Sequence, residues 1–179
     1  MLTLHRVSGV TAPDGRTVPG HAVVVDGTRF AAVGPYEELL AEYGGRARVR
    51  EWAGVLTPGR YEPDAVALLE STYWPDPREA DDLGTAPLTG ADLDRLAMTD
   101  TRWAASARRG VQRLLSTGTT ALAGPFTRPP VRTAVARSGL RVSPVAPPAT
   151  GADADFAVLT PDGTCLTTVI AGRLLFRRR

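Results

Sequence analysis

The residues whose types could do chemistry are few and scattered. The chain has two histidines, His5 and His21, and a run of carboxylates between residues 62 and 82. Imidazoles and carboxylates can hold a metal ion or transfer protons. Neither histidine has a carboxylate or thiol at ligand spacing, so we interpret both as structural or surface residues, with a metal pair as the alternative.

The acidic run has the same two interpretations. Paired carboxylates could perform acid/base work or bind a cation, but a run of this kind is more often a solvated loop, which is our interpretation here. Its members are Glu62, Asp64, Glu70, Asp76, Glu79, Asp81 and Asp82.

Three further features have candidate chemistry. Cys165 is the sole cysteine, which excludes an internal disulfide, and its strand-like neighbourhood favours a buried structural thiol over a nucleophile. Tyr73 and Trp74 lie in a proline-rich stretch, where an exposed aromatic pair would contact a ligand or a subunit and a buried pair would simply pack. We therefore name Glu70, Tyr73 and Trp74 as candidate ligand-binding residues.

Composition excludes several classes of protein. With 43% hydrophobic and 22% charged residues in 179, the chain is expected to fold as a globular domain with an insertion. No apolar run approaches a membrane span and the N-terminus has no secretory signal, so we expect no membrane contact and a cytoplasmic location. All 21 basic residues are arginines, and the net charge is only +2. Because these arginines do not cluster on one element, we expect no nucleic-acid partner.

The first sixty residues predict strands, and the middle predicts alternating helices and strands. Apolar runs meet at the hairpin signal Asp26-Gly27, and Pro35 with Gly44 brackets a short helix. The other expected strands are 2–7, 46–52, 55–59, 119–124 and 140–145, with a turn-rich stretch at 11–20. The other expected helices are 64–71, 89–98 with a Thr89/Asp92 capping box, 101–118 and 129–139.

The helix over 101–118 places one apolar stripe on its core side, and the end of the chain returns to strands. The stripe consists of Trp103, Ala107, Val111, Leu114 and Leu115. After a proline-rich linker at 145–153, three strands follow, with turns at 161–163 and at 171–172.

Four passages, in this order, resemble a known family. VVVDGTRFAAVGPYEEL (23–39) is similar to the opening strands of metal-dependent amidohydrolases of the imidazolonepropionase and aminofutalosine deaminase kind, and VLTPG (55–59) is similar to their strand that enters the catalytic barrel. LLSTGTTALAG (114–124) is similar to the first barrel helix and second barrel strand, and residues 154–178 are similar to the closing strands. The resemblance implies a small β-sandwich built from both chain ends.

The departures from this family concern its chemistry. Those enzymes follow TPG with a segment like N-A-H-T-H-L-E-S, whose two histidines hold zinc or iron, and here DAVALLES places Val66 and Leu68 there. Without the two-residue insertion that this alignment implies, the positions fall on Asp64 and Val66, and the pair is still lost. The absence of lysine leaves no carbamylated metal bridge. A complete barrel takes about 250 residues, so the segment 61–146 has room for about two of its eight units.

The sequence therefore predicts an α+β fold, with a composite β-sandwich of residues 1–59 and 153–179 and a truncated α/β insertion over 60–152. We predict a degenerate, non-catalytic amidohydrolase-like pseudoenzyme without metal or cofactor, acting as a binding or interaction module. A homodimer or a protein partner is expected, and the ligand would be a small molecule. The alternative is a hydrolase of carbon-nitrogen bonds other than peptide bonds, like imidazolonepropionase or a deaminase, with a rebuilt site.

Overall fold

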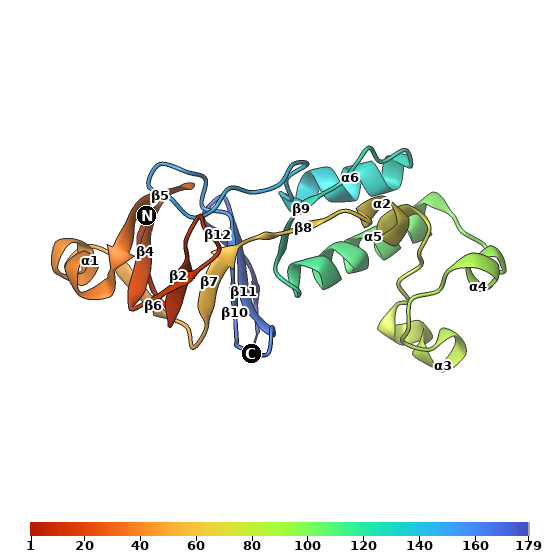
Figure 1. Cartoon of the computed structure of the whole chain (residues 1–179). Helices are drawn as coiled ribbons and strands as arrows, with labels where there is room; N and C mark the ends of the chain where they lie inside the picture. The colour runs from red at the N-terminus through yellow and green to blue at the C-terminus, as the bar shows by residue number, and fades with distance from the viewer. Residues whose placement is uncertain (179) are drawn as a thin grey trace.

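The computed structural model describes residues 1–178 and shows an elongated molecule (Figure 1). Two β-sheets form one end, and a group of helices around a short parallel sheet forms the other. The strands of the larger sheet come from both ends of the chain. The predicted α+β fold is confirmed.

The first sheet has the strand order β5-β4-β1-β6. Its members are β1 (Leu2–Arg6), β4 (His21–Asp26), β5 (Arg29–Pro35) and β6 (Arg48–Glu51). β4 and β5 form the hairpin that Asp26-Gly27 predicts. Helix α1 (Tyr36–Tyr43) begins directly after Pro35 and ends at Gly44, as predicted.

The second sheet has the order β12-β11-β10-β7-β2-β3 and joins the two ends of the chain. Its members are β2 (Gly9–Thr11), β3 (Thr17–Pro19), β7 (Val55–Pro58), β10 (Phe156–Leu159), β11 (Cys165–Ile170) and β12 (Arg173–Arg177). β10 pairs antiparallel with β7, which places Val158 opposite Leu56. The predicted composite sandwich is therefore confirmed.

Strand β4 explains why its sequence is a continuous apolar run. Val23 and Val25 enter the core between the two sheets, together with Phe30. Ala22 and Val24 point the other way, into a smaller core that α1 covers. A strand buried on both faces has no polar alternation to show.

The insertion begins with two parallel strands, β8 (Arg60–Glu62) and β9 (Thr119–Leu122). Gly59 allows them to approach, because a Cβ there would lie 1.8 Å from the Thr120 hydroxyl oxygen. A parallel bridge from Ala121 to Arg141 continues the sheet, as the expected β-α-β unit requires. The Arg141 guanidinium also donates to the buried Asp155 carboxylate at 2.6 Å, which fastens the insertion to the sandwich.

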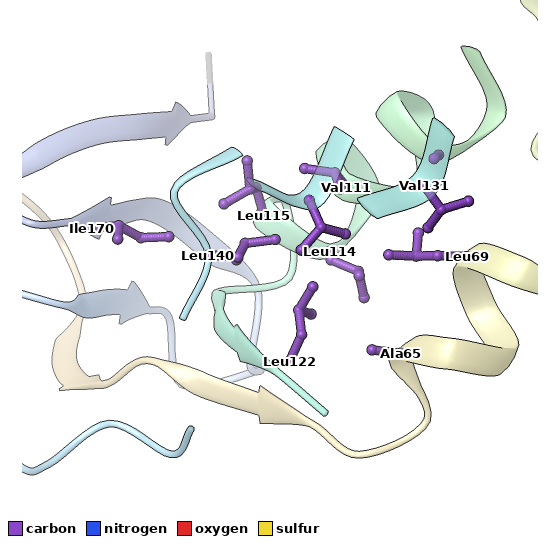
Figure 2. Close-up of a cluster of buried hydrophobic side chains, with 11 residues drawn as sticks. Ala65, Leu69, Val111, Leu114, Leu115, Leu122, Val131, Leu140 and Ile170 are labelled. Atoms are coloured by element: carbon purple, nitrogen blue, oxygen red, sulfur yellow. The ribbon is translucent and has the colours of Figure 1, made fainter. Parts of the chain in front are cut away.

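The insertion also contains helices. They are α2 (Ala65–Glu70), the 3₁₀ turn η1 (Pro77–Glu79), α3 (Ala80–Leu83), α4 (Gly90–Asp94), α5 (Asp100–Leu115) and α6 (Pro129–Ser138). Of these, α5 and α6 lie beside the short sheet, and α3 and α4 lie at the far end of the molecule (Figure 1). Figure 2 shows Leu69, Val111, Leu122 and Val131 pointing toward one another from α2, α5, β9 and α6. The stripe predicted for α5 is buried along its whole length. The domain limits at residues 59 and 153 stay a prediction.

Three local predictions were wrong, and the short strand β3 was not predicted. The turn-rich stretch 11–20 contains β3, which is only three residues long and too short for a periodic signal. β6 is mostly exposed rather than half-buried, because it is an edge strand. Within residues 1–178 the Thr89 side chain caps nothing, since Asp92 pairs with Arg95 at 2.9 Å. Instead of a strand over 140–145, a single bridge forms.

No helix in residues 1–178 has the length and apolar character needed to cross a membrane.

Candidate functional site

The positions that the sequence resemblance aligns with metal-binding histidines, Val66 and Leu68 or else Asp64 and Val66, lie on α2 or at its N-cap. β8 ends at Glu62, and Val66 and Leu68 follow on α2, where both are half-buried. Two residues two apart share one face of a strand, but on a helix they point about 200° apart. Positions 66 and 68 therefore do not face a common point, whatever side chains they carry.

Glu70, a predicted ligand-binding residue, is buried and its carboxylate is occupied. It accepts hydrogen bonds from the backbone N–H of Thr127 at 2.7 Å and of Arg128 at 2.6 Å, and from the Thr127 hydroxyl at 2.9 Å. The Arg128 guanidinium in turn lies 4.3 Å from the ring centre of Trp103 on α5. Glu70 thus fixes the loop that leads into α6.

Tyr73 is only 1% exposed and lies at the centre of a polar network. Its hydroxyl donates to the Glu79 carboxylate, and the guanidinium groups of Arg102 and Arg109 contact the same hydroxyl at 3.4 Å. Arg102 also donates to Glu79 at 2.8 Å, and Arg109 to Asp76 at 3.2 Å. The network ties η1 and the preceding segment to α5.

Electrostatics within this network follow from its contacts. The hydrogen bond from the Tyr73 hydroxyl, followed by that from the Asp76 amide, lowers the pKa of Glu79 to about 2. Burial, followed by the bond to Glu79, raises the pKa of Tyr73. Both shifts strengthen the arrangement seen, a neutral phenol that donates to a carboxylate.

Trp74 extends the same contacts toward α2 and α5. Its indole N–H donates to the Leu68 carbonyl at 2.9 Å, and its backbone N–H donates to the Ser106 hydroxyl at 2.9 Å. Gly110 of α5 leaves room for the indole, since a Cβ there would lie 2.8 Å from Nε1. Glu70, Tyr73 and Trp74 thus make internal contacts, and their part in ligand binding stays a prediction.

His5 has a structural setting in the sandwich. It is 3% exposed, its Nδ1 accepts a hydrogen bond from the Trp52 indole at 3.2 Å, and Phe156 meets its ring edge-on. Burial, with a smaller contribution from Arg50, lowers the pKa of His5 to about 4, so the ring is neutral at neutral pH. His21, at the start of β4, is half-buried.

Cys165 is also buried, at 2% exposure, and its thiol contacts the Thr168 hydroxyl at 3.4 Å. Burial raises the pKa of this thiol, which disfavours the nucleophilic thiolate.

An open groove of about 710 Å³ lies between α5 and α6, and we call it the α5–α6 groove. Its apolar floor is formed by Ala104, Val111, Leu115, Ala134 and Leu175, and its more polar rim by Asp100, Arg108, Gln112, Thr133 and Arg137. A volume of this size is within the range of pockets that hold small organic molecules.

Two arginines of the rim differ from those of the Tyr73 network. The guanidinium groups of Arg108 and Arg137 form no hydrogen bond or ion pair with any other residue in 1–178, and both side chains are exposed. The sequence analysis missed these residues. The signal that could have found them is a second stripe of small and polar residues on α5, next to the buried stripe.

Residues 22–45 match the family model of the bacterial imidazolonepropionase-like composite domain. No curated protein matches the chain. The matched segment covers the β4–β5 hairpin and α1, which are part of the sandwich.

Solved structures extend the likeness to most of the chain. The ochratoxinase of A. niger is similar with a TM-score of 0.52 at 17% identity, over 82% of this chain and 30% of that one. A triazine hydrolase from Arthobacter aurescens gives 0.52 at 17% identity, over 78% of this chain and 34% of that one. The likeness to amidohydrolases is confirmed. At these identities it shows the amidohydrolase-like fold alone.

A zinc-bound adenosine deaminase from Xanthomonas campestris has the same likeness, with a TM-score of 0.50 at 16% identity, over 78% of this chain and 32% of that one. The amidohydrolase-like chain thus spans about a third of the length of each of these proteins.

The residues present do not fit the family's metal. In the described part of the chain, no three His, Cys, Asp or Glu side chains come together as an ion would require. In the first alignment both matching positions have aliphatic side chains, and in the second only Asp64 could bind an ion. The buried Glu70 carboxylate already accepts hydrogen bonds from the 127–128 loop. One carboxylate alone does not make a zinc or iron site.

Proposed function

We propose that this protein is an amidohydrolase-like binding module that does not use the family's metal-assisted hydrolysis. The observation that supports the proposal is that the segment after β8 folds as α2, so that Val66 and Leu68, which the resemblance aligns with metal ligands, do not face a common point. A metal-activated water needs an ion held by several donors with one position left open. In this structure the same region is α2, which packs against α5.

The remaining polar groups support the same proposal. The carboxylates of Glu70, Glu79 and Asp76 each already bind groups of this chain. A general base needs a carboxylate that reaches the substrate. Binding needs only an accessible surface with suitable chemistry, which the α5–α6 groove supplies.

Ammonia release from amide, amidine and aminopurine compounds, with and without added Zn²⁺, Fe²⁺ or Mn²⁺, tests this proposal. We expect no release above that of the buffer. Release that a chelator abolishes would overturn it and favour the alternative, a carbon-nitrogen hydrolase with a rebuilt site.

We also propose that the chain forms a homodimer through the open edge of β8. Among the described residues, β8 pairs with β9 on one side only, and Tyr61 at its centre is 39% exposed. Arg60 and Glu62 flank Tyr61, so an antiparallel two-fold pairing centred on Tyr61 places each arginine opposite the partner's glutamate. A second copy thus satisfies both the strand edge and its charges.

Light scattering at micromolar concentration measures this association. The wild type should have the mass of a dimer, and Tyr61→Lys should have that of a monomer, because edge lysines oppose strand pairing. Arg29→Lys, a substitution on another exposed position, is the control and should leave the dimer intact. A monomeric wild type would contradict the proposed dimer, but it would not bear on the proposed binding function.

A further inference from the structure

We propose that the α5–α6 groove binds a small organic anion, a molecule with a flat or aliphatic apolar body and one carboxylate. This inference rests on the proposed binding function and names the class of ligand. It depends on three features of the groove: unpaired cations on the rim, an apolar floor, and an uneven distribution of charge along its length.

The cationic groups of the rim belong to Arg108 and Arg137, whose exposed side chains line the groove. Arg102 and Arg109 of α5 each bind a carboxylate of this chain, at 2.8 and 3.2 Å. Arg108, the direct neighbour of Arg109, lines the groove with Arg137 of α6, and neither forms an ion pair within residues 1–178. A guanidinium binds a carboxylate through parallel N–H donors, so these two groups are suited to an anion.

The apolar floor of the groove favours a ligand with an apolar body. Val111 and Leu115 line the groove although they are only 4% and 2% exposed, and the half-buried Ala104, Ala134 and Leu175 of β12 line it as well. Burial of an apolar body on these side chains contributes about 25 cal/mol per Å². A volume of about 710 Å³ accommodates a bicyclic ring system rather than an inorganic ion.

The charge distribution sets the orientation. Asp100 lies at the first turn of α5, whereas Arg108 lies two turns later and Arg137 in the last turn of α6. The carboxylate is expected at the arginine end, where Gln112 adds a hydrogen-bonding group. Asp100 disfavours the opposite orientation.

Titration of the full chain with 1-naphthoate, followed by amide chemical shifts, tests the inference. We expect shifts confined to α5, α6 and the β11–β12 turn region near Leu175. Arg108→Gln and Arg137→Gln should each weaken binding about five-fold, since each removes one charge-assisted contact in a partly exposed site. Arg113→Gln and Arg132→Gln are the matched controls, because both lie on the same helices outside the groove.

Uncharged 1-naphthamide separates the contributions of charge and floor. It should bind the wild type about as weakly as 1-naphthoate binds the double variant of Arg108 and Arg137. High salt should weaken only the carboxylate, because the cations are exposed. No binding of 1-naphthoate, shifts elsewhere, or equal loss in the control variants would each overturn the inference.

Failure of this inference and failure of the proposed function have different signatures. If the Arg108 and Arg137 variants bind naphthoate as tightly as the wild type, the organic-anion site is rejected. The proposal that the protein does not use metal-assisted hydrolysis is then unaffected. Chelator-sensitive ammonia release rejects the proposed function, whether or not naphthoate binds in the groove.

Discussion

The two sides of α5 use the same residue type in opposite ways. On the side that faces η1, Arg102 and Arg109 bind Glu79, Asp76 and the hydroxyl of Tyr73. On the side that faces α6, Arg108 lines an open groove and has no partner within residues 1–178. Neighbouring positions on α5 thus face two different settings: a polar network that is paired within the chain, and an open groove.

The two sides thus differ in whether their charged groups are paired within the chain. The side that faces η1, which comprises Tyr73, Trp74, Asp76, Glu79, Arg102 and Arg109, satisfies its buried polar groups from within the chain, and Glu70 does the same with the loop before α6. Buried donors and acceptors need such partners, so these residues stabilise the fold. On the groove side, Arg108 and Arg137 are exposed and form no ion pair within residues 1–178.

The largest expected effect is that of Glu70→Ala. The variant leaves the backbone N–H groups of Thr127 and Arg128 without their acceptor. Since bonds to a charged group contribute about 1.5–3 kcal/mol, we expect the free energy of unfolding to fall by about 3 kcal/mol. Denaturant unfolding measures it, with Glu38→Ala on the exposed face of α1 as control. An unchanged midpoint with lost ligand binding would instead favour Glu70 as a ligand contact.

Arg109→Ala and Arg108→Ala form a matched pair that tests the comparison itself. Arg109 donates to the Trp74 carbonyl at 2.7 Å and to Asp76, so its loss should lower the free energy of unfolding by about 2 kcal/mol. Loss of the unpaired Arg108 should change it by less than about 0.5 kcal/mol. Urea unfolding of both variants measures the two changes in free energy. Equal destabilisation would show that the groove arginine also has an internal role.

A smaller effect is expected from acid. Glu79 has a pKa lowered to about 2, so its contribution to stability is present above the carboxylate's ordinary pKa and is lost as the pH falls toward 2. Thermal unfolding between pH 5 and pH 2 should therefore show a decline that Glu79→Gln reduces. The Asp81→Asn variant, at an exposed acid of the same segment, should keep the decline. A decline identical in all three proteins would place its origin elsewhere.

Much of the fold could be predicted because its signals are local. The Asp26-Gly27 turn, the Pro35 and Gly44 limits of α1, and the apolar stripe of α5 all lie within single elements. β3 could not be predicted, because three residues among turn formers carry no period.

The site was harder to predict because its contacts join distant parts of the chain. Glu70 meets its partners 57 and 58 residues later, and Trp74 meets Ser106 32 residues later. Residue type alone therefore marked Glu70, Tyr73 and Trp74 as candidates but could not show that their polar groups bind within the chain. The groove depends on how α5 and α6 pack, which no single helix pattern contains.

The central proposal is that this chain, which is similar in fold to amidohydrolases, does not hold a catalytic metal ion. Metal content, measured by plasma mass spectrometry on untagged protein purified without chelator, tests it most directly. The account predicts zinc, iron and manganese far below one equivalent per chain. Near-stoichiometric metal would contradict it and direct attention to His5, His21 and the carboxylates between residues 62 and 82.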